Sequence, residues 1–202
     1  ITVASVQTEV REGNIGYIKI RRFAEDTNDL INAAASSFSD KGVKGIVVDV
    51  RDNPGGYLDT SVSVSSQFMK SGVVVEERSK FGPNKTLKAT SGGNFTNLPV
   101  VVLINPGSAS ASEIMAGALH DSGRATLVGE KSFGKGSVQQ VVDLKNGASL
   151  KVTVAHWYTP KGVNIGKEGI KPDVEVKLTA DDYNASRDPQ LAKAYEVLKS
   201  KF

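Results

Sequence analysis

Cysteine is absent from this chain of 202 residues, and histidine occurs only twice. The lack of cysteine excludes disulfide bonds, a thiolate nucleophile and Cys-ligated zinc, and it suits an extracytoplasmic protein without proving one. Two histidines offer little for a His-rich metal site. Long apolar runs are missing as well: no stretch approaches the ~18 residues of a membrane-spanning helix, and no signal-peptide pattern follows Ile1. We therefore expect the chain as given to be soluble.

A strongly one-sided charge is also missing. The 25 Lys and Arg residues nearly balance 22 Asp and Glu residues, and the two signs are interspersed along the sequence. A nucleic-acid-binding surface would need its basic residues clustered on one face. We therefore expect no nucleic-acid partner. The length and the 39% hydrophobic content are ordinary for one well-buried domain over residues 1–202.

The most informative stretch is residues 98–117, which changes character three times. Residues 100–104 form an apolar run typical of a strand buried on both faces, and residues 105–107 (Asn-Pro-Gly) predict a turn. From Ser108 onward, small residues and then apolar ones predict a helix. Serines at such a junction lie near a helix N-terminus, where free N–H groups and the helix dipole favour negative charge. Acyl transfer requires this arrangement.

The remaining pattern alternates strands with helices and predicts an α/β domain with a largely parallel sheet and right-handed crossovers. In such a sheet the loops 52–56, 105–110 and 130–136 meet at one carboxyl edge. The segment 80–97 is rich in Gly, Asn, Thr and Ser and predicts an irregular hairpin or loop. Strands are expected at 16–20, 45–50, 73–77, 125–129, 138–144 and 148–158, the last two joined at Asn146-Gly147, and further helices begin near Asp26 or Thr27, Leu58 and Asp188-Pro189.

A serine nucleophile needs a base. His120 is ten residues beyond Ser110 on the same expected helix, hence roughly 15 Å away, whereas a base must lie within about 3 Å. His156, in a predicted strand, is interpreted as a core or strand-face histidine. Lys135 lies between two glycines in the loop 130–136, where we expect its ammonium to be desolvated so that the neutral amine serves as base. The spacing leaves a solvated surface lysine as the alternative.

Two glycine-rich turns carry competing interpretations. Gly129, Gly134 and Lys135 nearly match a nucleotide-binding loop, but Gly136 replaces the Ser or Thr that would hold magnesium, and a strand-like pattern follows. The turn at 52–56 could direct backbone N–H groups at an oxyanion, or could simply be a tight turn.

Four motifs in this order resemble the carboxyl-terminal processing (tail-specific) serine proteases, over nearly the whole chain. They are DVRDNPGG (49–56), NPGSASASEIMAGALHD (105–121), GEKSFGKGSVQQ (129–140) and YTPKG…GIKPD (158–173).

The resemblance implies a role for individual residues and a ClpP/crotonase-like core of ββα units. It makes Ser110 the nucleophile, Lys135 the general base and Gln139 the residue that orients the lysine, and it assigns the oxyanion donors to the backbone of Gly56 and Ala111. It further implies a serine endopeptidase that cleaves proteins near extended C-terminal tails, outside the cytoplasm (periplasmic, cell-surface or secreted), with no cofactor. The full-length protein would be exported or membrane-anchored, and an oligomer is possible.

Family members commonly carry a PDZ module and an export signal ahead of the segment that begins at Gly16. We expect neither in this chain, which we interpret as the protease core. A non-catalytic ligand- or peptide-binding domain on the same fold, as in retinoid-binding proteins, and an acyl-CoA-handling crotonase relative are the alternatives. The joint presence of the serine, lysine, glutamine and NPGG turn argues against both.

The other polar residues of 105–121 receive structural interpretations. Ser108 and Ser112 face away from Ser110 on a helix, so we expect them to cap or pack. Glu113 would complement the helix dipole, and Asp121 would be structural.

Overall fold

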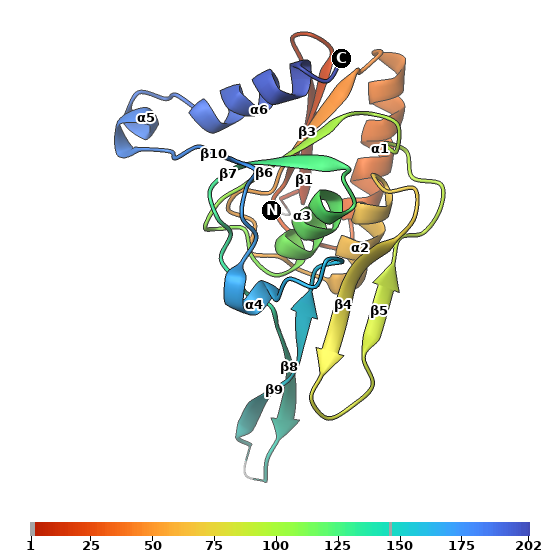
Figure 1. Ribbon diagram of the computed structural model, residues 1–202, viewed down its shortest axis with the longest axis vertical. Coiled ribbons are helices and arrows are strands. Elements are labelled where there is room, and N and C mark those ends of the chain that lie inside the picture. Colours follow the sequence, from red (N-terminus) through yellow and green to blue (C-terminus); the bar gives the residue numbers. More distant parts are fainter. Residues whose placement is uncertain (1–2, 146) are drawn as a thin grey trace.

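The computed structural model describes residues 3–145 and 147–202, so Asn146 of the predicted hairpin turn lies outside the described residues. The helices and strands follow one another as an α/β chain (Figure 1). In order they are β1 (Val6–Arg11), β2 (Ile15–Ile20), α1 (Thr27–Asp40), β3 (Gly45–Asp49), α2 (Leu58–Ser66), β4 (Val73–Ser79), β5 (Lys85–Lys88), β6 (Val100–Ile104), α3 (Ala111–Asp121), β7 (Ala125–Gly129), β8 (Ser137–Asp143), β9 (Ser149–Tyr158), α4 (Ile165–Glu168), β10 (Val174–Glu175), α5 (Ala180–Asn184) and α6 (Pro189–Lys199).

The central sheet has the strand order β1-β2-β3-β6-β7-β10. Strands β2, β3, β6, β7 and β10 run parallel, and β1 pairs antiparallel with β2 at the edge. The predicted, largely parallel sheet is therefore confirmed. The apolar runs of β3 and β6 are wholly buried because helices cover both faces of the sheet.

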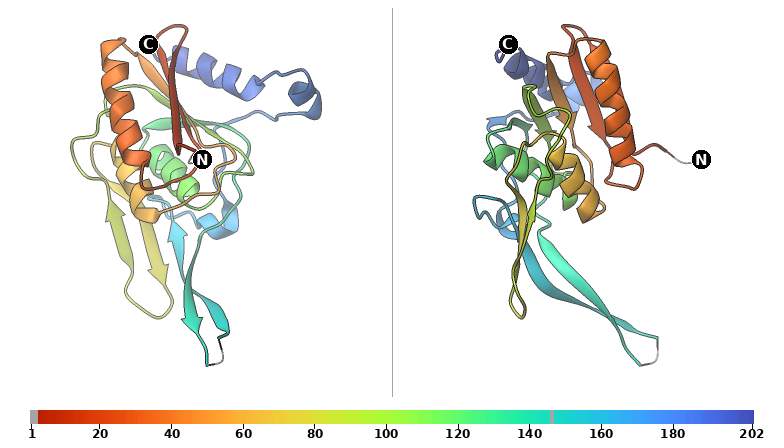
Figure 2. Two further views of the ribbon diagram at one scale, coloured as in Figure 1. Left: turned by 180° about the vertical axis from the view of Figure 1, so that it is seen from behind. Right: turned by 90° about the vertical axis from the view of Figure 1, so that its right-hand side faces the viewer.

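Each strand divides its side chains between two apolar clusters. On β6, Val100, Val102 and Ile104 face the cluster formed with α1, α2 and α3, whereas Val101 and Leu103 face α6. This alternation follows from the two-residue repeat of a strand. The result is three layers, with α1 to α3 on one side of the sheet and α6 on the other (Figure 2).

A second sheet has the order β5-β4-β9-β8 and is wholly antiparallel. Its β8–β9 hairpin projects from the body of the molecule (Figure 1). The expected irregular hairpin or loop over residues 80–97 is confirmed, because residues 85–88 form β5 and pair with β4 with a shift in register, while the rest of the segment is irregular. Among the described residues, no helix is long and apolar enough to cross a bilayer.

Candidate active site

Three loops meet at the carboxyl edge of the central sheet, as the parallel topology predicts. Ala109 N donates to Asn53 O (3.0 Å), which joins the serine turn to the loop 52–56. Phe133 N donates to Ser108 O (3.0 Å), which joins the serine turn to the loop 130–136. The turn that carries Ser110 therefore lies between the other two.

Ser110 occupies the N-cap position of α3 and adopts φ 56° and ψ −116°. A non-glycine residue rarely adopts a positive φ, and such strain persists only where the surroundings hold it. Here Ser110 N donates to a carboxylate oxygen of Glu113 (2.8 Å), and Ser110 O accepts from the N–H groups of Glu113 and Ile114. The half-buried side chain is thereby held at the start of a helix, where the macrodipole favours developing negative charge.

The expected oxyanion donors lie beside this serine. A Cβ added to Gly55 would lie 2.8 Å from Ser110 Cβ, and one added to Gly56 would lie 2.0 Å from Phe23 O, so this turn admits only glycines. The N–H of Gly55 is taken by Asn53 Oδ1 (2.9 Å). The N–H groups of Gly56 and Ala111, in contrast, donate no hydrogen bond within residues 3–145 and 147–202. Both are free to bind an oxyanion.

Lys135 is less buried than expected, and Gln139 is exposed as well. Both side chains are exposed, and the Lys135 ammonium has no ion-pair partner among the described residues. The expectation that the flanking glycines desolvate the lysine is wrong in this chain, because glycine adds no apolar cover of its own. The main chain of Lys135 is nevertheless fixed: its N–H donates to Glu113 Oε2 (2.8 Å).

Glu113 is the residue whose importance the sequence interpretation missed. Its carboxylate is fully buried and accepts four hydrogen bonds. One oxygen accepts from the N–H groups of Ser110 and Lys135, and the other accepts from Ser132 Oγ (2.5 Å) and Gly134 N (2.6 Å). Glu113 thus complements the helix N-terminus as expected, and it also joins the serine turn to the lysine loop. The Ser-x-x-Glu spacing of a capping box was the available signal.

The other polar residues have the structural roles that we expected. Ser108 Oγ donates to Val50 O (2.8 Å), and Ser112 Oγ donates to Asn53 O (2.9 Å). His120 bonds to Asp121 and to Asp173, so it does not serve the serine.

Comparison with known proteins identifies the family that this geometry fits. The family model described as peptidase family S41 matches residues 14–176. The chain belongs to peptidase family S41. It is 41% identical over 179 residues to a carboxy-terminal processing protease, CtpA, of Bacillus subtilis (strain 168), which covers 88% of this chain and 38% of the relative. It is 43% identical over 202 residues to a carboxy-terminal-processing protease of Bartonella bacilliformis, which covers 98% of this chain and 44% of that relative. The chain therefore spans less than half the length of these relatives.

Solved structures support the same family and confirm the ClpP-like fold. A photosystem II D1 C-terminal processing protease matches with a TM-score of 0.80 and 36% identity, over 88% of this chain and 49% of that one. The tricorn protease matches with a TM-score of 0.59 at 22% identity, over 94% of this chain and 18% of that one, and so shares the fold alone.

An open cavity of about 640 Å³ lies beside the Gly55-Gly56 turn of this S41 domain. The segment around Phe23 forms one wall and Tyr57 another, and the cavity is lined by apolar and charged groups. Gly55 and Gly56 both line this cavity.

A buried ion pair, between Arg51 and Asp49, lies directly before the loop 52–56 in the sequence. Arg51 donates to both oxygens of Asp49 (2.7 to 3.2 Å), and Lys19 Nζ adds a further contact to Asp49 (3.1 Å). Burial opposes the charged form of Asp49, but Arg51 and Lys19 outweigh it and lower the pKa of this carboxyl. Burial, followed by the nearby charge of Asp49, raises the pKa of Tyr17, whose hydroxyl donates to Asp49 Oδ2 (2.8 Å). In this S41 domain the loop 52–56 thus follows directly after an ionised, hydrogen-bonded carboxylate.

Proposed function

We propose that this chain is the catalytic core of a serine endopeptidase that cleaves proteins near their C-terminal tails. The observation that carries the proposal is the position of Ser110. It adopts a positive φ at a helix N-terminus and lies against Gly55, and the N–H groups of the adjacent Gly56 and Ala111 have no partner among the described residues. A binding domain has no need for a nucleophile placed beside an oxyanion site. Membership of family S41 and the names of its relatives support the same conclusion.

The reaction proceeds in two halves. Ser110 Oγ attacks the scissile carbonyl while the neutral amine of Lys135 accepts the serine proton. The N–H groups of Gly56 and Ala111 stabilise the tetrahedral oxyanion, and the lysine then protonates the leaving amine. Water, activated by the same amine, hydrolyses the acyl-enzyme and releases Ser110.

Because Lys135 is exposed, the bound substrate has to complete the surroundings of its amine. To accept the serine proton, the lysine must present a neutral amine. A peptide that lies in the cavity beside Gly56 and extends beyond it to Ser110 and Lys135 displaces water from the lysine and favours the neutral amine. Gln139, on β8, then orients the amine by a hydrogen bond that adds no charge. Catalysis in this arrangement begins only when the site is filled.

The names of the relatives support a proposal for the location of the whole protein. One relative, from Tetradesmus obliquus, is named as a chloroplastic C-terminal processing peptidase and is 38% identical over 176 residues, which is 87% of this chain and 38% of that relative. We place the full-length protein outside the cytoplasm, exported or membrane-anchored, with extended protein tails as substrates and oligomerisation possible.

The decisive experiment is Ser110→Ala, assayed on an unstructured protein and with a fluorophosphonate probe that labels active serines. We expect hydrolysis and labelling to be lost while the melting temperature stays nearly unchanged, because the change removes one oxygen and no core volume. Lys135→Ala should remove nearly all turnover, and Gln139→Ala should reduce kcat in part by loosening the aim of the base.

Ser122→Ala provides the matched control, since this serine lies at the other end of α3. It should keep full activity. Hydrolysis that survives Ser110→Ala would refute the assignment of the nucleophile. Specific peptide binding by a wild-type chain that never cleaves would favour the binding-domain alternative.

A further inference from the structure

Asp188, the N-cap residue of helix α6, accepts hydrogen bonds both from the helix itself and from Arg51. Asp188 caps the helix by accepting from Leu191 N (2.9 Å). Its two oxygens also accept from the two terminal nitrogens of Arg51 (2.9 and 2.8 Å). Arg51 immediately precedes the loop 52–56 that carries the oxyanion glycine. The family match ends at residue 176, so α6 lies beyond it.

Gln190, two residues later, is 1% exposed and uses both ends of its amide. The oxygen accepts from Arg51 Nη1 (3.0 Å), and the nitrogen donates to Glu130 Oε2 (3.1 Å) and to Val176 O (2.8 Å). The partners fix the orientation of the amide, because a guanidinium can only donate and a carboxylate or carbonyl can only accept.

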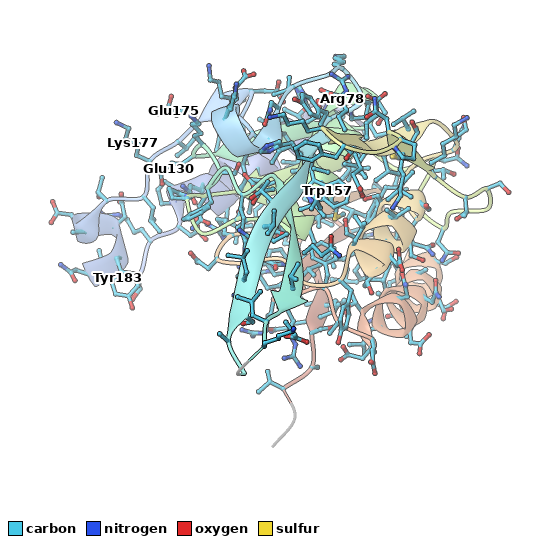
Figure 3. The ribbon with its side chains drawn as sticks, turned by 90° about the horizontal axis from the view of Figure 1, so that it is seen from below. Arg78, Glu130, Trp157, Glu175, Lys177 and Tyr183 are labelled. Carbon is cyan, nitrogen blue, oxygen red and sulfur yellow. The ribbon has the colours of Figure 1, made fainter. Side chains whose placement is uncertain are left out.

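Arg51 and Glu130, the two charged partners of Gln190, lie at the start of two different loops of the site. Arg51 leads into the oxyanion loop, and Glu130 opens the loop 130–136, which carries Lys135. Figure 3 shows Glu130 on the same side of the molecule as Glu175 and Lys177, the neighbours of Val176. One buried amide thus connects both loops to the same helix.

Attachment of α6 does not itself need this polar network. The helix already buries Ala194 and Leu198 completely against the sheet. Buried charged and polar groups cost much of what they gain because they must leave water. Their value here therefore lies in geometry: hydrogen bonds have defined directions and lengths, whereas apolar packing tolerates small shifts.

We propose that Gln190, assisted by Asp188, is a positioning residue that sets the oxyanion loop and the lysine loop relative to each other through Arg51 and Glu130. The inference rests on the proposed peptidase function, and it extends the catalytic unit to α6.

The test uses Gln190→Met, which keeps the length of the side chain but removes all three hydrogen bonds. Hydrogen exchange measured by mass spectrometry reports the mobility of the loops 52–56 and 130–136, and peptide hydrolysis reports kcat and KM separately. We expect kcat to fall by about 10- to 100-fold with KM changed by less than about threefold, since small misplacements of catalytic groups act mainly on the chemical step. Exchange should accelerate in both loops.

Asp188→Asn tests the second contact, because asparagine still caps a helix but carries no charge for Arg51. It should accelerate exchange in the loop 52–56 and leave the loop 130–136 as in the wild type. Ala194→Gly is the matched control: it weakens the same helix one turn from Gln190 without touching the network. This control should lower the melting temperature while kcat and both loops stay unchanged.

Wild-type kcat and wild-type loop exchange in Gln190→Met would overturn the proposal. So would an equal loss of kcat in Ala194→Gly at a matched drop in melting temperature. If the wild-type chain shows no peptidase activity, the proposed function fails, and the exchange measurements still decide whether α6 sets the loops.

Discussion

At the scale of single residues, the site depends on a carboxylate that performs no chemistry. Glu113 accepts four hydrogen bonds from two segments of the chain, the serine turn and the loop 130–136, and each of its oxygens takes two. A charged acceptor forms bonds roughly twice as strong as a neutral one. This charge therefore suits the task of holding Ser110 at a positive φ while fixing the main chain of Lys135.

Glu113→Gln should be costly for that reason. The amide replaces one acceptor oxygen with a donor, which then faces two N–H or O–H donors in a buried place. Each unsatisfied buried group costs about 1 to 3 kcal/mol. We expect the free energy of unfolding to fall by about 2 to 4 kcal/mol on this basis, and kcat to fall by more than about tenfold. Urea denaturation and peptide hydrolysis measure the two effects.

Glu12→Gln is the control, because Glu12 is exposed in the turn between β1 and β2. It should change neither quantity. Equal stability and equal kcat in the two variants would show that the four hydrogen bonds of Glu113 contribute neither to the free energy of unfolding nor to kcat.

The sequence indicated some site residues better than others, and the difference is physical. A serine turn at a helix start could be placed because a strand, a turn and a helix start all lie within one stretch of sequence, whereas the choice of Ser110 within that turn came from the family resemblance. The partners of Glu113 are up to 22 residues away, so local spacing suggested the cap alone. The exposure of Lys135 depends on what lies over the loop in space, and its flanking glycines do not determine that.

At the scale of elements, the interior strands of the central sheet were predictable and its two edge strands were not. The apolar runs of β3, β6 and β7 identify buried parallel strands directly. Strand β1 alternates buried and exposed residues irregularly at the edge, and β10 is two residues long. Their pairing depends on neighbours far along the chain, so neither was expected.

The β8–β9 hairpin departs most from the usual burial of apolar side chains. Its outer half exposes Val141, Val142, Leu144 and Leu150, and the hairpin projects away from the core (Figure 1). The base of the hairpin differs, because the side chain of Trp157 is buried and the backbone N–H of Trp157 donates to Gly136 O (2.8 Å). The base should therefore contribute to stability and the tip should not.

Replacing residues 142–150 by Asn-Gly tests the tip, since this dipeptide closes a two-residue hairpin between Val141 and Lys151. Little buried surface is lost, so we expect the melting temperature to change by about 2 °C or less. Light scattering on heating should decrease, because exposed apolar residues on an edge strand promote association. Differential scanning calorimetry and static light scattering measure these effects.

Trp157→Ala, at the base of the same hairpin, is the contrasting variant and should destabilise by about 3 to 5 kcal/mol. A tip replacement that lowers the melting temperature as much as Trp157→Ala would show that the tip packs against the body of the protein.

At the scale of the whole molecule, one ionic network joins the layers. Arg51 connects Asp49, at the end of a central strand, with Asp188, at the start of α6. Burial opposes ionisation of each carboxyl, yet the hydrogen bonds and charge of Arg51 hold the pKa of both below the ordinary 3.8. A lowered pKa in the folded state contributes stability that is present above the ordinary value and is lost as pH falls through the folded one.

Arg51→Met should raise the pKa of Asp49 instead of leaving it lowered. The carboxylate stays buried at 1% exposure but loses its main partner, so burial then raises its pKa. Removing one partner of a buried pair costs about 3 to 5 kcal/mol, and we expect that deficit at pH 7. Below the ordinary carboxyl pKa of 3.8 the variant protonates Asp49 readily and no longer buries an unpaired charge, while the wild type begins to lose the stability that its lowered pKa supplies, so the deficit should shrink.

Urea denaturation at pH 7 and pH 3 measures the two deficits, and Arg187→Met serves as control. Arg187 is 61% exposed in its pair with Asp182, and exposed pairs contribute less than about 1 kcal/mol. Its removal should cost little at either pH. An Arg51→Met deficit that is the same at pH 7 and pH 3 would mean that Asp49 does not depend on Arg51 for its charge. The layers would then be held by apolar packing alone, and the ionic contact between the sheet and α6 would have no measurable role in stability.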